Sequence, residues 1–143
     1  EIPQGIFLRC GEEVSDKAKA LGHIMAFNYP GTLRAQEVLK YYGGIREAPH
    51  YRPDLDLSLV NKQGEVVSFC NVFIDELNRI GIFEPVGTHI DYRRRGLGRA
   101  VIYESLNRLR SMGIVKAYTG PMQPFYERIG FEIEVDMKVW SKA

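Results

Sequence analysis

The sequence predicts an α/β domain (an α+β arrangement) with a mixed, mainly antiparallel sheet of six or seven strands and about four helices. Apolar and polar residues follow a strand pattern at 55–61 and 65–74, and a tight turn containing Gly64 separates the two segments. Apolar residues recur with the period of a helix at 96–112. Since 143 residues are enough for one core, we expect residues 1–143 to form a single domain.

The first part of the chain predicts one strand and two helices. A weak alternation marks the strand at 5–10. Ser15 and Thr32 are residue types that favour N-caps, and they begin the helices predicted at 15–27 and 32–42. The Asn-Tyr-Pro-Gly segment between these helices is typical of a break.

The fourth predicted strand covers residues 79–88 and contains Pro85. Proline has no N–H to donate to a neighbouring strand, so its presence marks either a sheet edge or a bulge. A bulge changes which face the neighbouring side chains occupy. The direction of Glu84, a charged residue in an otherwise apolar run, therefore depends on the geometry at Pro85.

After this strand the chain predicts the helix at 96–112, a short strand at 115–119 and a short helix at 122–129. The segment 131–140 then alternates as a strand does, and it counts as two strands if it breaks near Asp136.

Composition excludes several classes of protein. A net charge of +1 argues against nucleic-acid and acidic-membrane partners, and no apolar run is long enough to span a membrane. Cys10 and Cys70 lie on strands that are not predicted to be neighbours, which indicates reduced thiols in a cytoplasmic protein. No cysteine and histidine spacing suggests a metal site. Because Glu1 is not a methionine, either the start was removed or the chain is part of a longer or tandem protein.

The segment Arg93–Gly98 reads Arg-Arg-Arg-Gly-Leu-Gly and joins the fourth strand to the long helix. Helix N-termini expose unpaired N–H groups and the positive end of the helix dipole. Glycine lets a bulky anion approach this backbone, and the arginines add positive charge. The turn therefore predicts a phosphate or pyrophosphate site.

Several motifs together resemble the GNAT superfamily of N-acetyltransferases. The family's glycine motif is Arg or Gln, two residues, Gly, one residue, then Gly or Ala, and it corresponds to Arg93, Gly96 and Gly98. The lead-in before it and the Phe-Tyr-Glu-x-x-Gly-Phe element also match, at 88–93 and 125–131. Thr119 stands where the family frequently has an asparagine, a departure that concerns one cofactor contact.

The resemblance implies acetyl-coenzyme A (acetyl-CoA) as the acetyl donor, bound without a metal in a gap between the fourth and fifth strands. A bulge in the fourth strand, for which Pro85 gives a local reason, frees backbone groups for the pantetheine arm of the cofactor. The arginine side chains either reach the phosphates or stay solvated. The cofactor-binding residues implied are Val86, Gly87, Thr88, Arg93, Arg94, Arg95, Gly96, Leu97, Gly98, Arg99 and Tyr126.

Two residues are candidates for catalysis. Tyr126 corresponds to the family tyrosine near the cofactor sulfur, where a phenol is able to protonate the leaving thiolate. Glu84 is the candidate base that takes the proton of the amine, directly or through water, and its alternative roles are an exposed edge residue or a substrate-binding carboxylate. His89 is a further base by residue type, but the resemblance places it beside the cofactor-binding turn.

The resemblance implies acetyl transfer from acetyl-CoA to a primary amine of a small molecule or a peptide. The alternative is a non-catalytic acyl-CoA-binding or regulatory domain of a tandem protein, which would keep Gly96 and Gly98 but lack a competent base. A nucleic-acid-binding module would need a more basic surface. A homodimer or a second GNAT-like domain is the partner that the family suggests.

Overall fold

The computed structural model describes residues 1–136, 138 and 140–142. Its 5-stranded sheet follows chain order, and all neighbouring pairs are antiparallel except the parallel pair at the end. The strands are β1 (Phe7–Cys10), β2 (Asp56–Val60), β3 (Val66–Asp75), β4 (Ile80–Thr88) and β5 (Lys116–Tyr118). The α+β class and the mixed, mainly antiparallel sheet are therefore as predicted.

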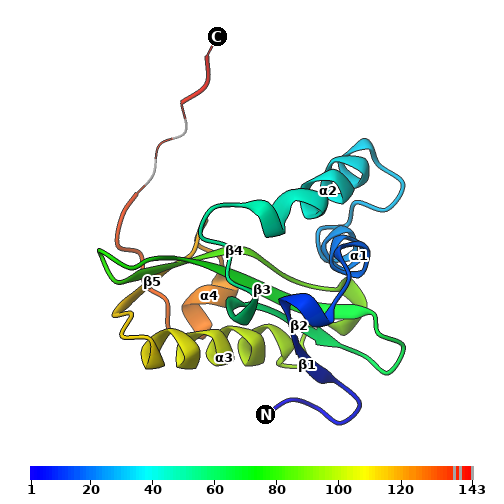
Figure 1. The fold of residues 1–143 in the computed structure, drawn as a ribbon, viewed down its shortest axis with the longest axis horizontal. Helices are drawn as coiled ribbons and strands as arrows, with labels where there is room; N and C mark the ends of the chain where they lie inside the picture. The colour runs from blue at the N-terminus through cyan, green and yellow to red at the C-terminus, as the bar shows by residue number, and fades with distance from the viewer. Residues whose placement is uncertain (137, 139, 143) are drawn as a thin grey trace.

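Helices cover both faces of this sheet (Figure 1). One layer contains α1 (Asp16–Ala26) and α2 (Leu33–Gly44), and the other contains α3 (Leu97–Ser111) and α4 (Pro124–Arg128). Short 3₁₀ turns, which the sequence patterns do not predict, connect these elements: η1 (Gly11–Glu13), η2 (Ile45–Glu47), η3 (Pro53–Leu55) and η4 (Ile90–Tyr92).

The first two helices begin where their capping residues predict. The Ala18 N–H donates to Ser15 Oγ at 3.1 Å, and the Ala35 N–H donates to Thr32 Oγ1 at 3.3 Å. Each bond satisfies a backbone donor that has no partner inside the helix. The N-termini of α1 and α2 are therefore capped by the side chains of Ser15 and Thr32.

Most of the core lies between the sheet and α3. This helix contributes Leu97, Val101, Ile102 and Leu109, each at most 2% exposed. They pack in one cluster with buried side chains of the strands and of α4: Leu57, Leu59, Val67, Cys70, Val72, Phe83 and Tyr126. The amphipathic pattern of 96–112 thus fixes the helix against the sheet with its N-terminus at the end of β4.

The bulge expected at Pro85 is present in β4. Val86 pairs with Cys70 and Phe83 pairs with Val72, so Glu84 and Pro85 together oppose Asn71. The parallel pairing of β4 with β5 covers only Ile80–Ile82, and the rest of β4 is not paired with β5. This short pairing is compatible with the splay expected between the fourth and fifth strands, which stays a prediction.

The prediction of six or seven strands was wrong, because the sheet has 5. Residues 131–136 alternate as expected, but no neighbouring strand hydrogen-bonds to them in the described part of the chain, and period-two patterning forms a strand only with a partner. Glu134 of this segment forms an ion pair with Lys116 of β5 (2.5 Å), while the side chains of Ile133 and Val135 are exposed. Positions 137 and 139 of the predicted strand lie outside the described residues.

Candidate functional site

The N-terminus of α3 differs from those of α1 and α2. Its N-cap is Gly96, with a left-handed φ of 76°, and no side chain caps the helix. Arg94 also has a positive φ, at 61°. An uncapped N-terminus leaves the amides of the first turn without intrahelical partners. The positive end of the α3 dipole and the exposed arginines therefore lie side by side, and both would attract an anion.

Gly98 lies where three parts of the chain meet. A Cβ at this position would come within 3.0 Å of the Phe125 ring and 3.2 Å of Thr88 Oγ1. The first turn of α3 therefore approaches α4 and the end of β4 so closely that a larger residue would require Phe125 or Thr88 to shift slightly. The fold brings together three predicted elements here: the glycine turn, the end of β4 and the Phe-Tyr-Glu helix.

The arginines of the turn have different surroundings. Arg93 donates to the carbonyl oxygens of Ala26 (2.6 Å) and Thr88 (3.3 Å), so it ties the turn to the end of α1. Arg95 donates to the Asp91 carbonyl at 3.1 Å and lies over the Tyr92 ring. Arg94 and Arg99 are exposed and make no hydrogen bond to another described residue through their side chains. Arg99 lies over the Tyr103 ring at 6.0 Å, so both Arg94 and Arg99 keep their hydrogen-bond donors available to an anion.

The residues predicted to contact the pantetheine arm occupy the half of β4 that is not paired with β5. Thr88 Oγ1 lies 2.9 Å from Ser68 Oγ, which fixes it against β3. Gly87 lies under the aromatic ring of Phe69, where a Cβ would come within 2.6 Å. The Leu97 side chain is 1% exposed and belongs to the core, so this residue offers only its backbone to a ligand.

Tyr126 is 7% exposed and packs with the core under α4. Its ring makes edge contacts with those of Phe125 (5.3 Å between centroids) and Phe131 (5.7 Å). Its hydroxyl makes no hydrogen bond to another described residue. Phe125 touches the position of Gly98, so the tyrosine lies one residue from the contact between α4 and the predicted anion site.

Glu84 is exposed, and its place in β4 puts it on the sheet face that carries α1 and α2. Its neighbour Phe83 packs into the α3 core on the opposite face. The half-exposed Tyr41 of α2 lies close enough to Glu84 to feel its charge. Burial raises the pKa of the Tyr41 phenol, and the negative charge of Glu84 raises this pKa further. The carboxylate in the bulge is thus exposed on the face that carries α2.

The sequence patterns missed Asn71, which holds the bulge. Its Nδ2 donates to the Glu84 carbonyl at 3.1 Å, although the residue is only 3% exposed. The regular pairing of β3 with β4 is interrupted at the bulge, and this side chain supplies a donor to the Glu84 carbonyl there. An asparagine in an apolar strand, opposite a proline, is a signal that points to such a role.

A buried ion pair on the same face was also missed. Lys19 of α1 pairs with Asp56 of β2, and the Tyr51 hydroxyl donates to Asp56 at 2.6 Å. Burial and the bond to Asp56 raise the pKa of Tyr51. The Lys19, Tyr51 and Asp56 side chains lose solvent here, but each has a polar partner. The Lys19–Asp56 ion pair therefore links α1 to β2 of the sheet.

His89 has a structural environment in the turn. Its Nδ1 accepts the Asp91 N–H at 3.2 Å, and its ring meets Tyr92 edge-on. This hydrogen bond caps the η4 turn before the glycine motif.

Over the described residues there is no group of three or more His, Cys, Asp or Glu side chains arranged to hold a metal ion. Among the helices that the structure describes, none has the length and hydrophobicity needed to cross a membrane.

Solved structures with the same fold include several acetyltransferases. A GCN5-related N-acetyltransferase from Sphaerobacter thermophilus aligns with a TM-score of 0.72 and 21% identity, covering 94% of this chain and 43% of that protein. The chain thus spans less than half of that relative. Glucosamine-6-phosphate N-acetyltransferase from Arabidopsis thaliana aligns at 0.66 and 19%, covering 94% and 97%. An aminoglycoside N-acetyltransferase, AAC(6')-Iy in complex with CoA, aligns at 0.72 and 16%, covering 99% of each chain.

The comparison with curated proteins finds no match. Residues 54–133 match the family described as Acetyltransferase (GNAT) domain. This range contains the bulged strand, the glycine turn, α3 and α4, which are the elements that build the site. The chain therefore belongs to the GNAT family of acetyltransferases.

Proposed function

We propose that this chain transfers the acetyl group of acetyl-CoA to a primary amine. The observation that carries the proposal is the uncapped, arginine-rich N-terminus of α3 beside the part of β4 that is not paired with β5. The pyrophosphate binds to the amides of the turn 94–99, with the side chains of Arg94 and Arg99 nearby. Arg93 and Arg95 contribute through the backbone that they stabilise. The pantetheine arm runs along Val86, Gly87 and Thr88 at the free edge of β4.

The reaction is a direct attack. The neutral amine nitrogen bonds to the thioester carbonyl carbon, the carbon–sulfur bond breaks, and the sulfur leaves with the electron pair. Glu84 accepts the proton that the amine loses, directly or through water, because its carboxylate is exposed on the acceptor side of β4. Tyr126 gives a proton to the departing thiolate of CoA and is reprotonated from solvent. Most of the rate enhancement comes from positioning the two reactants.

Known acceptors of similar structures are amines. One neighbour is a glucosamine-6-phosphate N-acetyltransferase, and another was solved with a bisubstrate analogue that joins CoA to an acetylneamine. These names support an amine acceptor for this chain without identifying it. The two free thiols, Cys10 and Cys70, fit the cytoplasmic location expected from the sequence. We also propose that residues 1–143 form one acetyltransferase domain, either alone, as a homodimer or beside a second such domain.

The first test is calorimetric titration with CoA. Gly98→Asp places a negative charge and extra bulk at the turn, so we expect affinity for CoA to fall more than tenfold. Gly43→Asp is the matched control, since nothing lies within 4 Å of a Cβ at Gly43, far from the turn in α2. Both variants are checked for folding by circular dichroism. Equal affinity in the folded Gly98 variant would remove the phosphate site.

A second assay separates an enzyme from a binding domain. Release of the CoA thiol is followed with acetyl-CoA and a library of primary amines. Amine-dependent release supports acetyl transfer. CoA binding without release from any amine would favour the alternative, a regulatory acyl-CoA-binding domain that binds the cofactor without using Glu84.

A further inference from the structure

A partly exposed apolar row crosses three strands beside Glu84 in the described part of the chain. Phe73 on β3 pairs with Ile82 on β4, and Ile82 pairs with Tyr118 on β5, so the three side chains share one face of the sheet. Residues next to them in sequence, including Ile74, Phe83 and Ala117, pack into the α3 core on the other face. The row therefore lies on the face that carries α1, α2 and Glu84.

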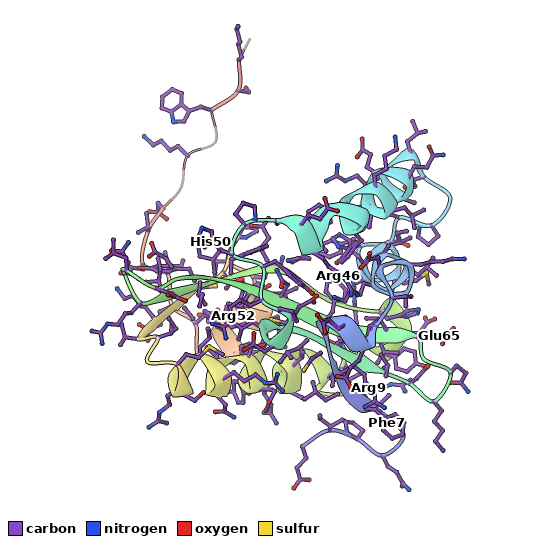
Figure 2. The ribbon with its side chains drawn as sticks, viewed as in Figure 1. Phe7, Arg9, Arg46, His50, Arg52 and Glu65 are labelled. Atoms are coloured by element: carbon purple, nitrogen blue, oxygen red, sulfur yellow. The ribbon has the colours of Figure 1, made fainter. Side chains whose placement is uncertain are left out.

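The helices leave this row open. The contacts of α1 are with β3 and β4, at Val66 and near Gly87, whereas α2 packs mainly on α1. Arg46, labelled in Figure 2, holds the end of α2 to the start of α1 by donating to Asp16 (2.8 Å) and to the Val14 carbonyl (2.6 Å). Figure 1 shows the β5 end of the sheet without a helix on this side. Ile82 is accordingly 42% exposed.

Two carboxylates border the row, and one of them, that of Asp75, also accepts from the Asn78 side chain at 2.7 Å. Asp75 and Glu84 lie on the same face as the row, one at each side of it. Lys116, the basic residue of this face on β5, is already paired with Glu134. From α2, Tyr41 faces this region with 45% of its surface exposed. A ligand here meets an apolar floor, an aromatic ring and carboxylates, which together favour a cation with an apolar body.

Resting on the proposed function, we infer that the acceptor is a primary amine with an apolar or aromatic body and no phosphate. Its ring or alkyl chain lies on Phe73, Ile82 and Tyr118, and its amino group reaches Glu84 at the bulge. This selects against glucosamine 6-phosphate, because a phosphate near Asp75 and Glu84 would be repelled. The row thus sets which amine is acetylated, while the glycine turn binds the donor.

The test compares amines with the same reacting group in the thiol-release assay. We expect kcat/KM for 2-phenylethylamine and n-hexylamine to exceed that for ethanolamine at least tenfold, with glucosamine 6-phosphate the poorest. Ile82→Ser should raise KM for 2-phenylethylamine at least tenfold and leave KM for acetyl-CoA unchanged, and Ile82→Val should retain most of the wild-type value. Leu77→Ser, at an exposed apolar residue in the β3–β4 turn, is the control and should change neither.

Other outcomes overturn the inference in distinguishable ways. Equal turnover of ethanolamine and 2-phenylethylamine would reject the apolar row and keep the transferase. If no amine turns over, binding of 2-phenylethylamine to the CoA complex, followed by ligand-observed NMR, decides the question. Binding that Ile82→Ser abolishes would keep the row as a binding site, and absence of binding would reject it. A wild-type dimer that Ile82→Ser converts to monomer would assign the row to a second copy of the chain instead.

Discussion

The sheet face that carries α3 is filled by closely packed apolar side chains, whereas the face toward α1 and α2 is polar at its centre and open at the β5 end. The first holds Leu109 and Phe83 in one cluster. The second buries Asp56 and Asn71 beside exposed Ile82 and Glu84. The pleat of β4 sends adjacent residues to the two faces, so a single strand anchors the core and presents Glu84 on the proposed acceptor side.

The difference between the two faces should be largest in the free energy of unfolding when the adjacent β4 residues Phe83 and Ile82 are each replaced. Phe83→Ala leaves a cavity in the α3 core and should lower the free energy of unfolding by about 3–5 kcal/mol. Ile82→Ala removes a side chain that is 42% exposed and should cost less than about 1 kcal/mol. Urea denaturation of both variants provides the measurement. Similar losses would mean that the α1 and α2 face is packed as tightly as the other.

Glu84→Gln should affect chemistry without affecting packing. The amide keeps the size of the side chain but cannot accept the amine proton, so kcat should fall about tenfold to a hundredfold. The loss should shrink at higher pH, where more of the acceptor is already neutral. A pH–rate profile and a melting curve are compared with those of Glu76→Gln, an exposed glutamate in the β3–β4 turn. Full activity with wild-type stability would leave water as the base.

Tyr126→Phe tests the α3 face at the point where it borders the proposed cofactor site. The ring remains packed between Phe125 and Phe131, and only the proton donor is removed. We expect kcat to fall up to about tenfold while KM for acetyl-CoA changes less, because the hydroxyl acts mainly as the sulfur departs. Steady-state kinetics at several donor concentrations give both constants. A rise in KM equal to the fall in kcat would make Tyr126 a binding contact.

The sequence was sufficient for the parts of this architecture that depend on local signals. Ser15 and Thr32 identify two helix starts because capping is a local interaction. Pro85 indicates the bulge because proline lacks a donor, and the glycine turn identifies the start of α3. These features need no knowledge of distant residues.

Features that depend on distant partners were not predicted. Asn71 holds a carbonyl 13 residues away, and Arg93 reaches the carbonyl of Ala26, 67 residues earlier in the chain. The alternation at 131–136 was read as a strand, but a strand also needs a neighbour to pair with. The apolar row is likewise visible only in the register of three strands.

Replacing His23 should have the smallest effect of these changes, and it should act on the stability of the face that carries α1 and α2. His23 stacks between Phe27 (4.6 Å between centroids) and Phe69 (5.6 Å), and its Nδ1 lies 3.1 Å from the Tyr42 hydroxyl. Burial, with a smaller contribution from the charge of Arg34, lowers the pKa of His23 from 6.5 to about 4. Between these values the unfolded chain takes up a proton that the folded chain refuses.

The free energy of unfolding should therefore fall as pH decreases from about 6.5 to about 4, while above this window His23 is neutral in both states and contributes no slope. His23→Phe keeps an aromatic ring between Phe27 and Phe69 but cannot titrate. Urea denaturation at several pH values should give this variant a shallower acid slope than the wild type, whatever its stability at neutral pH. Since His23 is partly exposed, solvent screens the effect and the change in slope should be modest. Parallel slopes in the two proteins would place the acid sensitivity in the carboxylates instead, leaving the aromatic stack as a packing feature alone.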